Sequence, residues 1–181
     1  MRLEDLNTLA DAAAEREFLR CCGSTRWARE MAASRPFVNA ESMAETGDAI
    51  GSSLERSDWL EAFAAHPRIG ARAEAPAATP SGLPRGVSPK KVGFPGRKWA
   101  TEEQAGAAGA SGEVRQSLAQ RNRDYEARFG YIFIVCATGK SADEMLAMLE
   151  RRLTNDPDTE LQIAAGEQRK ITRLRLVKLL T

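Results

Sequence analysis

Only one segment of the 181-residue chain, residues 131–137, has the continuous apolar and β-branched character of a buried strand. A strand needs a neighbour to pair its backbone N–H and C=O groups, and no second segment of this kind occurs. The remaining sequence has the apolar spacing and the end signals of helices. We therefore predict an all-α fold, a helical bundle forming one domain over residues 1–181, with residues 131–137 as an extended segment buried among the helices.

Capping residues predict where the helices of the first half begin and end. Apolar residues at helical spacing follow each cap. The residue before a proline is disfavoured in the helical conformation, so a helix must end before it. The first predicted helix covers residues 11–22 and stops at Gly23, and the second is capped by Ser24, carries Trp27 and Met31 and ends before Pro36. The third is capped by Asn39 and runs through Met43, Ile50 and Leu54. The fourth is short, is capped by Ser57, carries Trp59, Leu60 and Phe63, and leads into His66.

The second half begins with residues 71–98, which are rich in Ala, Pro, Gly and basic residues and predict a long, mobile surface loop. The helical pattern resumes near Thr101, and a longer helix follows Gly112 and stops at Gly130. A capping box at residues 141–144 opens the next helix. The last helix begins at Asp156-Pro157, and its predicted core stripe consists of Leu161, Ala164, Gln168, Ile171, Leu174 and Arg175.

Composition excludes several classes of function. The chain has 26 basic and 25 acidic side chains, so its net charge of +1 provides no field for a polyanion, and we expect neither nucleic acid nor a membrane as a partner. Basic residues between Arg85 and Lys98 are the only support for nucleic-acid binding, and loops of this composition are usually solvated. We find no signal peptide, no membrane-spanning stretch and no C-terminal peroxisomal signal, and we expect a soluble, cytoplasmic protein.

The cysteines and the histidine limit metal chemistry. Cys21, Cys22 and Cys136 cannot all pair and show no Cys-x-x-Cys spacing, so we expect reduced, buried thiols. With a single histidine and no thiolate cluster, we expect no metal site.

His66 is that single histidine, and it follows the C-terminal end of a predicted helix. The negative end of the helix dipole favours imidazolium by roughly 0.3 to 1 kcal/mol, which predicts a pKa raised toward neutrality, suitable for an acid or a base. The alternative is that His66, beside Pro67, only caps the helix.

Three further features have both a structural and a functional interpretation. Arg175 lies on the predicted core stripe, where a buried guanidinium needs either a structural partner or an anionic ligand. Glu103 lies near a predicted helix start, where it either binds a ligand or simply faces solvent. Residues 133–137 are either plain core or a source of backbone N–H and C=O groups for a polar ligand.

Taken in order along the chain, a set of short motifs resembles the 2-oxo-4-hydroxy-4-carboxy-5-ureidoimidazoline (OHCU) decarboxylases. The motifs are Leu6-Asn7, Phe18, Cys22-Gly23, Trp27, Arg35-Pro36-Phe37, Asp58-Trp59-Leu60, His66-Pro67-Arg68-Ile69-Gly70, Glu103-Gln104-Ala105-Gly106, Asn122, Tyr125, Arg128-Phe129-Gly130, residues 133–137, Glu167, Lys170-Ile171 and Leu174-Arg175-Leu176. The resemblance implies an all-helical homodimer without metal or cofactor that converts OHCU to (S)-allantoin in urate catabolism.

The resemblance also implies the site residues. The implied catalytic residues are His66, Glu103 and Arg175, and the implied substrate-binding residues are Pro67, Ala100, Thr101, Glu102, Glu103, Gln104, Phe133, Ile134, Val135, Cys136 and Ala137. Ala100 replaces a serine that is common in the family and so removes a hydroxyl contact, and the loop between His66 and Glu103 is longer than in many relatives.

In the implied reaction, carbon dioxide leaves and the electrons of the broken C–C bond flow into an adjacent imine, so that no metal or pyridoxal is needed. His66 then supplies or relays a proton to one face, Arg175 orients an anionic or carbonyl oxygen, and Glu103 binds the hydroxyl or ureido group and tunes His66. Two alternatives remain: an inactive relative kept as a helical interaction module, and a hydrolase or lyase for another small ureido compound. The sequence leaves open an association with a hydroxyisourate hydrolase.

Overall fold

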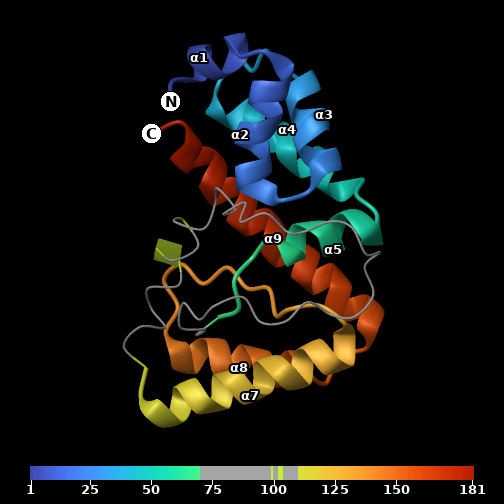
Figure 1. The fold of residues 1–181 in the computed structure, drawn as a ribbon, viewed down its shortest axis with the longest axis vertical. Coiled ribbons are helices and arrows are strands. Elements are labelled where there is room, and N and C mark those ends of the chain that lie inside the picture. The colour runs from blue at the N-terminus through green and yellow to red at the C-terminus, as the bar shows by residue number, and fades with distance from the viewer. Residues whose placement is uncertain (70–98, 100–101, 104–109) are drawn as a thin grey trace, which may run out of the picture.

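A computed structural model of the chain describes residues 1–69, 99, 102–103 and 110–181. Its principal helices are α1 (Leu3–Thr8), α2 (Asp11–Cys22), α3 (Thr25–Ala33), α4 (Ala40–Ser52), α5 (Arg56–Ala64), α7 (Gly112–Phe129), α8 (Ala142–Arg152) and α9 (Pro157–Leu179) (Figure 1). The described residues contain no strand, which confirms the all-α prediction for this part of the chain. The loop predicted at 71–98 lies outside the described residues, as does Thr101, while Glu102 and Glu103 are helical, as the pattern predicted to resume near Thr101 requires.

Helix α9 connects the two ends of the structure. Figure 1 shows α1 to α4 gathered at one end, α7 and α8 side by side at the other, and α9 crossing between them. It packs against α2, α4 and α5, and it presents Ala164, Gln168 and Arg175 to the interior. A side chain on α9 can therefore reach both the end of α5 and the segment that follows α7.

Residues 131–137 are neither helix nor strand, and they are buried as predicted. Phe133 and Ile134 are each 2% exposed, and Val135 is 5% exposed. Since no strand lies beside the segment in the described structure, its backbone groups must find other partners or remain unpaired.

Gly23 joins the α2–α3 turn to the end of α5. It has a φ of 88°, which favours glycine, and a Cβ placed on it would lie 2.7 Å from the Cβ of Ala65. The hydroxyl of Ser24 then caps α3 by accepting the Trp27 N–H at 3.2 Å. This close approach fixes the end of α5 directly before His66.

Some helix boundaries differ from the predictions. Ser57 is not a cap, because α5 begins two residues earlier, after Glu55, whose N–H donates to the Asp58 carboxylate at 2.9 Å. Helix α4 ends at Ser52 and does not reach Leu54. The short helix α1 was not predicted.

Leu174 was wrongly assigned to the core stripe of the last helix. It is 37% exposed, whereas Ile171 and Arg175 are 5% and 1% exposed. Successive helical residues are about 100° apart, so turning Arg175 inward turns Leu174 toward the edge of the buried face. None of the described helices is long and apolar enough to cross a membrane.

Candidate active site

His66 lies where the chain leaves α5. Its backbone N–H donates to the Phe63 carbonyl at 3.0 Å, which closes the last turn before Pro67. The side chain is partly buried, and its Nε2 atom is sealed from solvent without a hydrogen-bond partner among the described residues. A buried polar atom without a partner is rare in proteins and needs an explanation, such as a ligand.

The surroundings of His66 favour the neutral imidazole. Its pKa is lowered to about 4, chiefly because burial disfavours the charged form and secondly because Arg175 is positive, while Glu103 opposes the shift. The prediction of a raised pKa was wrong, because the helix dipole is a small effect beside burial. At neutral pH, His66 can accept a proton.

Gln168, on the buried face of α9, is a further polar neighbour of His66. Its Nε2 donates to the Cys22 carbonyl and to the Thr172 hydroxyl, both at 3.3 Å. Its Oε1 is buried without a partner among the described residues. The Gln168 side chain favours the protonated form of His66, although its oxygen falls short of hydrogen-bond geometry. Two unsatisfied polar atoms therefore lie in the same region.

A small cavity joins His66 to the segment after α7. Its volume is about 20 Å³, enough for roughly one water molecule. The lining residues are His66, Pro67, Ile69, Phe133, Ile134, Val135 and Ile171. The structure thus brings together five of the residues predicted for the site from two regions that are far apart in the sequence.

Glu103 and Arg175 form a buried ion pair. Arg175 donates from Nε to one carboxylate oxygen at 3.1 Å and from Nη2 to the other at 2.8 Å, and Lys178 adds a longer contact at 3.4 Å. Burial would raise the pKa of Glu103, but Arg175 and Lys178 hold it below its ordinary value. The guanidinium of Arg175 therefore has a structural partner, and both charges act on His66.

Charged side chains hold part of the segment 133–137. Arg152 Nη1 donates to the Ile134 carbonyl at 2.7 Å, and the Cys136 N–H donates to Glu167 at 2.8 Å. Lys140 Nζ donates to the Cys136 carbonyl at 2.6 Å. The backbone N–H and C=O of Val135, between these contacts, have no partner among the described residues.

The other predicted binding residues are less involved. Glu102 is exposed and lies 4.0 Å from Lys178. Cys136 and Ala137 are buried but do not line the cavity beside His66. Ala100, Thr101 and Gln104 lie outside the described residues.

Sequence reasoning missed some members of this region. It gave no role to Ile69 or Lys178, placed Ile171 and Gln168 only in the core stripe, and did not identify Arg152. One signal was present, since polar residues on the buried face of α9 recur at seven-residue spacing, Glu160 with Glu167 and Gln168 with Arg175. Two helical turns span about seven residues, so this repeat marks a polar stripe on an otherwise apolar face.

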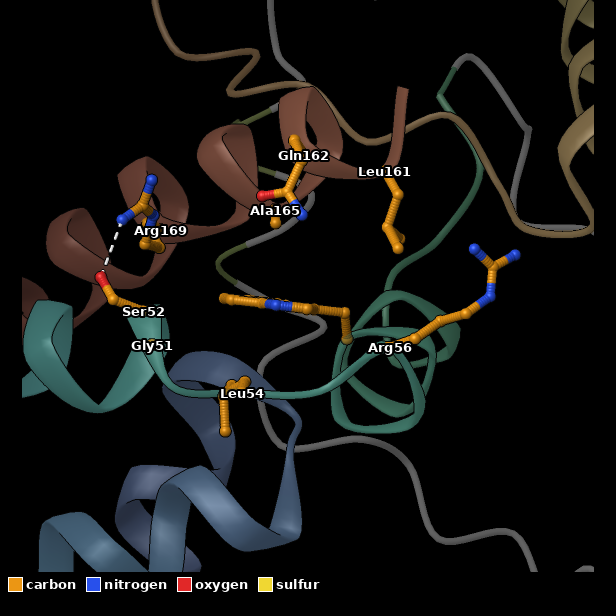
Figure 2. A pocket seen from close by; sticks show the side chains of 9 residues that line it. Gly51, Ser52, Leu54, Arg56, Leu161, Gln162, Ala165 and Arg169 are labelled. Carbon is orange, nitrogen blue, oxygen red and sulfur yellow. Dashed lines mark hydrogen bonds between the residues drawn. The ribbon is translucent and has the colours of Figure 1, made fainter. Parts of the chain in front are cut away.

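A larger hollow lies apart from this site, where the end of α4 and the start of α5 face the first half of α9 (Figure 2). It measures about 270 Å³ and shares no lining residue with the cavity beside His66. Arg169 crosses its rim and donates to the Ser52 hydroxyl at 3.1 Å (Figure 2). None of the predicted site residues lines it.

Comparison with known proteins gives this geometry a family context. A sequence model of OHCU decarboxylase matches residues 7–177. The chain belongs to the OHCU decarboxylase family. It is 38% identical to a crystallised OHCU decarboxylase, solved in the presence of (S)-allantoin, over 91% of this chain and 97% of that one, with a TM-score of 0.71. An (S)-allantoin synthase structure has the same fold at 17% identity and a TM-score of 0.67, covering 99% of this chain and 54% of that one.

Two relatives differ in how much of their length matches. The chain is 39% identical to the uric acid degradation bifunctional protein TTL of Arabidopsis thaliana over 91% of the chain, but it covers only 47% of that relative. It is 25% identical to an OHCU decarboxylase of Haloferax volcanii, over 98% of the chain and 95% of that protein. The family domain is thus matched almost throughout, while the bifunctional relative is about twice as long.

Proposed function

We propose that this chain is a carboxy-lyase that decarboxylates OHCU to (S)-allantoin in urate degradation. The observation that carries the proposal is the neutral His66, with an unsatisfied Nε2, beside a cavity and within the field of the Glu103–Arg175 pair. The family membership and the relatives described above support the choice of substrate.

The neutral state of His66 refines its role. When carbon dioxide leaves, the electrons of the broken C–C bond form a C=C bond with the imine carbon, the imine nitrogen takes up a proton from water, and an enol-like intermediate remains. The enol hydroxyl must then lose a proton, and the former imine carbon must gain one on a single face. A neutral imidazole can accept the first proton and deliver the second, so His66 acts as base and then as acid.

Arg175 and Glu103 are proposed to act as a unit. The positive guanidinium attracts the substrate carboxylate or a carbonyl oxygen, and the bidentate contact to Glu103 holds it in one orientation. Glu103 also favours a proton on His66, while Arg175 disfavours it. An anionic substrate beside His66 would raise its pKa from the lowered value of about 4, in the direction that proton uptake requires.

Substrate binding is proposed to involve Pro67, residues 100–104 and residues 133–137. Val135 supports this, because it lines the cavity and has an unpaired backbone donor and acceptor among the described residues. A ureido group or an imidazolone ring edge presents the complementary donor and acceptor. By resemblance to the family, we also propose a cytoplasmic homodimer without cofactor, and analytical ultracentrifugation tests the dimer.

The test uses the handedness of the product. Uncatalysed decay of OHCU gives racemic allantoin, so circular dichroism on freshly generated OHCU should show (S)-allantoin with the wild type and none above background with His66→Ala. Arg173→Ala, a change at a half-exposed helix position, serves as the control. Full stereoselective turnover by His66→Ala would contradict the assignment, and racemic product from the wild type would favour the interaction-module alternative.

A further inference from the structure

Val135 lies between two backbone groups that charged side chains bind. The carbonyl before it, of Ile134, accepts from Arg152 at 2.7 Å, and the N–H after it, of Cys136, donates to Glu167 at 2.8 Å. The N–H and C=O of Val135 itself have no partner among the described residues, although the residue is only 5% exposed. This pattern lies on the wall of the cavity beside His66.

The geometry of the peptide unit determines where the Val135 N–H and C=O point. In a planar trans peptide, the C=O and the next N–H point in opposite directions. Fixing the Cys136 N–H on Glu167 therefore directs the Val135 C=O away from Glu167. Fixing the Ile134 C=O on Arg152 likewise directs the Val135 N–H away from Arg152. The two charged side chains come from different helices, Glu167 from α9 and Arg152 from α8.

We infer that Glu167 is a positioning residue, which sets the orientation of the Val135–Cys136 peptide so that the Val135 carbonyl faces the substrate. This inference rests on the proposed function. A second hydrogen bond holds the carboxylate itself, since Lys170 donates to its other oxygen at 2.6 Å. Glu167 is only 7% exposed, and a buried carboxylate committed to one backbone N–H leaves that peptide a single favourable orientation.

Glu167 remains ionised in this setting. Burial would raise its pKa, but Lys170 and the Cys136 N–H outweigh burial and hold it below the ordinary value. Arg152 is the counterpart on the other peptide, but it also binds the fully buried Glu160, so its removal would damage the fold as well as the orientation. Glu167 is therefore the residue at which orientation can be tested.

The test compares three variants. Glu167→Met removes the acceptor at similar volume, Glu167→Gln keeps an acceptor oxygen without the charge, and Lys170→Met removes only the outer contact, from a side chain that is 66% exposed. We expect Glu167→Met to raise the KM for OHCU on the order of tenfold, with a smaller change in kcat. We expect Glu167→Gln and Lys170→Met to stay within about twofold, because the Cys136 N–H keeps a partner.

Two readouts are independent of turnover. In ¹⁵N spectra of the free protein, the Cys136 and Val135 amide resonances should move in Glu167→Met and stay near their wild-type positions in Glu167→Gln. In hydrogen exchange of the wild type, the Cys136 amide should exchange more slowly than the Val135 amide, and this comparison needs no variant to fold.

Each outcome decides the inference. Three results overturn the inference and leave the proposed function standing. The first is an unchanged KM with unmoved amide resonances in Glu167→Met, and the second is a rise in KM that also occurs in Glu167→Gln. The third is a Val135 amide that exchanges more slowly than the Cys136 amide. A wild type without OHCU turnover overturns the proposed function instead. The amide resonances and the exchange comparison then still show whether Glu167 orients the peptide.

Discussion

Glu103 and Arg175 lie 72 residues apart in the sequence and meet through two parallel hydrogen bonds, at 3.1 and 2.8 Å. Both side chains are almost fully buried, with 8% and 2% of their surface exposed. Taking two charges out of water is costly, and a hydrophobic pair of similar size is often as stable. The burial of this pair is therefore weak evidence for a contribution to stability, and its place near an unsatisfied histidine supports the role proposed for it above.

Breaking this pair should separate stability from activity. Arg175→Met leaves Glu103 with only the weaker Lys178 contact, and we expect a loss of about 3 kcal/mol in the free energy of unfolding together with loss of (S)-allantoin formation. The double variant Glu103→Leu/Arg175→Met should recover most of the stability and none of the activity. Urea unfolding and product circular dichroism measure the two effects. Recovered activity in the double variant would contradict a role for the pair in the reaction.

The stability of the protein should depend on pH through His66. Its pKa is about 4 in the folded state against an ordinary 6.5, so the unfolded chain binds the proton more readily as the pH falls below 6.5. The contribution of neutral His66 to the free energy of unfolding is complete above pH 6.5, and the free energy of unfolding decreases by about 2 kcal/mol as the pH falls from there to 5.

The assignment is direct because the chain has one histidine. Urea unfolding at pH 5.0, 6.0 and 7.0 should show this loss in the wild type and not in His66→Gln. The imidazole signals of the folded protein should titrate near pH 4 in NMR spectra. A folded-state pKa near 6.5 would contradict the burial argument.

Gln168 should adjust the basicity of His66. Its side chain favours the imidazolium, so Gln168→Leu is expected to lower the pKa of His66 further. Gln168→Glu is expected to raise it, because a carboxylate nearby stabilises the charged ring. The histidine NMR titration measures both shifts, and the acid limb of the pH–rate profile should move in the same directions. Equal pKa values in the two variants would show that Gln168 does not act on His66.

Several helix starts were predictable because their signals are local. Ser24, Ser141 and Asp156 each accept a backbone N–H within three residues, so the sequence alone identifies them. The short helix α1 has no comparable signal, because arginine is not a usual cap residue; Asp5 accepts hydrogen bonds there from the Arg2 backbone N–H and from its guanidinium. The buried extended segment was also predictable, because an apolar run without a strand partner has few other places to go.

Residues of the candidate site could be named from the sequence, but their electrostatics could not be predicted from it. The resemblance named His66, Glu103 and Arg175 as candidates, but burial could not be weighed against the helix dipole at His66 without the structure. Burial depends on α9, about a hundred residues later in the chain, and it reversed the expected direction of the pKa shift. The roles of Arg152 and Glu167, which bind the backbone on either side of Val135, were missed for the same reason, since these residues come from α8 and α9.

The last prediction concerns the buried network behind residues 133–137. Arg152 binds Glu160 through Nε at 2.7 Å and Nη2 at 2.6 Å, and it lies 4.7 Å over the Phe133 ring. Arg152→Met should lower the free energy of unfolding by about 3 to 5 kcal/mol, because it leaves the fully buried Glu160 without its cation.

Arg121→Met is the matched control, since it removes an arginine from exposed pairs with Asp124 and Glu150 and should cost less than about 1 kcal/mol. Urea unfolding of both variants at pH 7 gives the comparison. Equal losses would mean that Arg152 contributes no more than a surface charge. The Ile134 carbonyl would then be held by the packing of its neighbours instead of by the guanidinium.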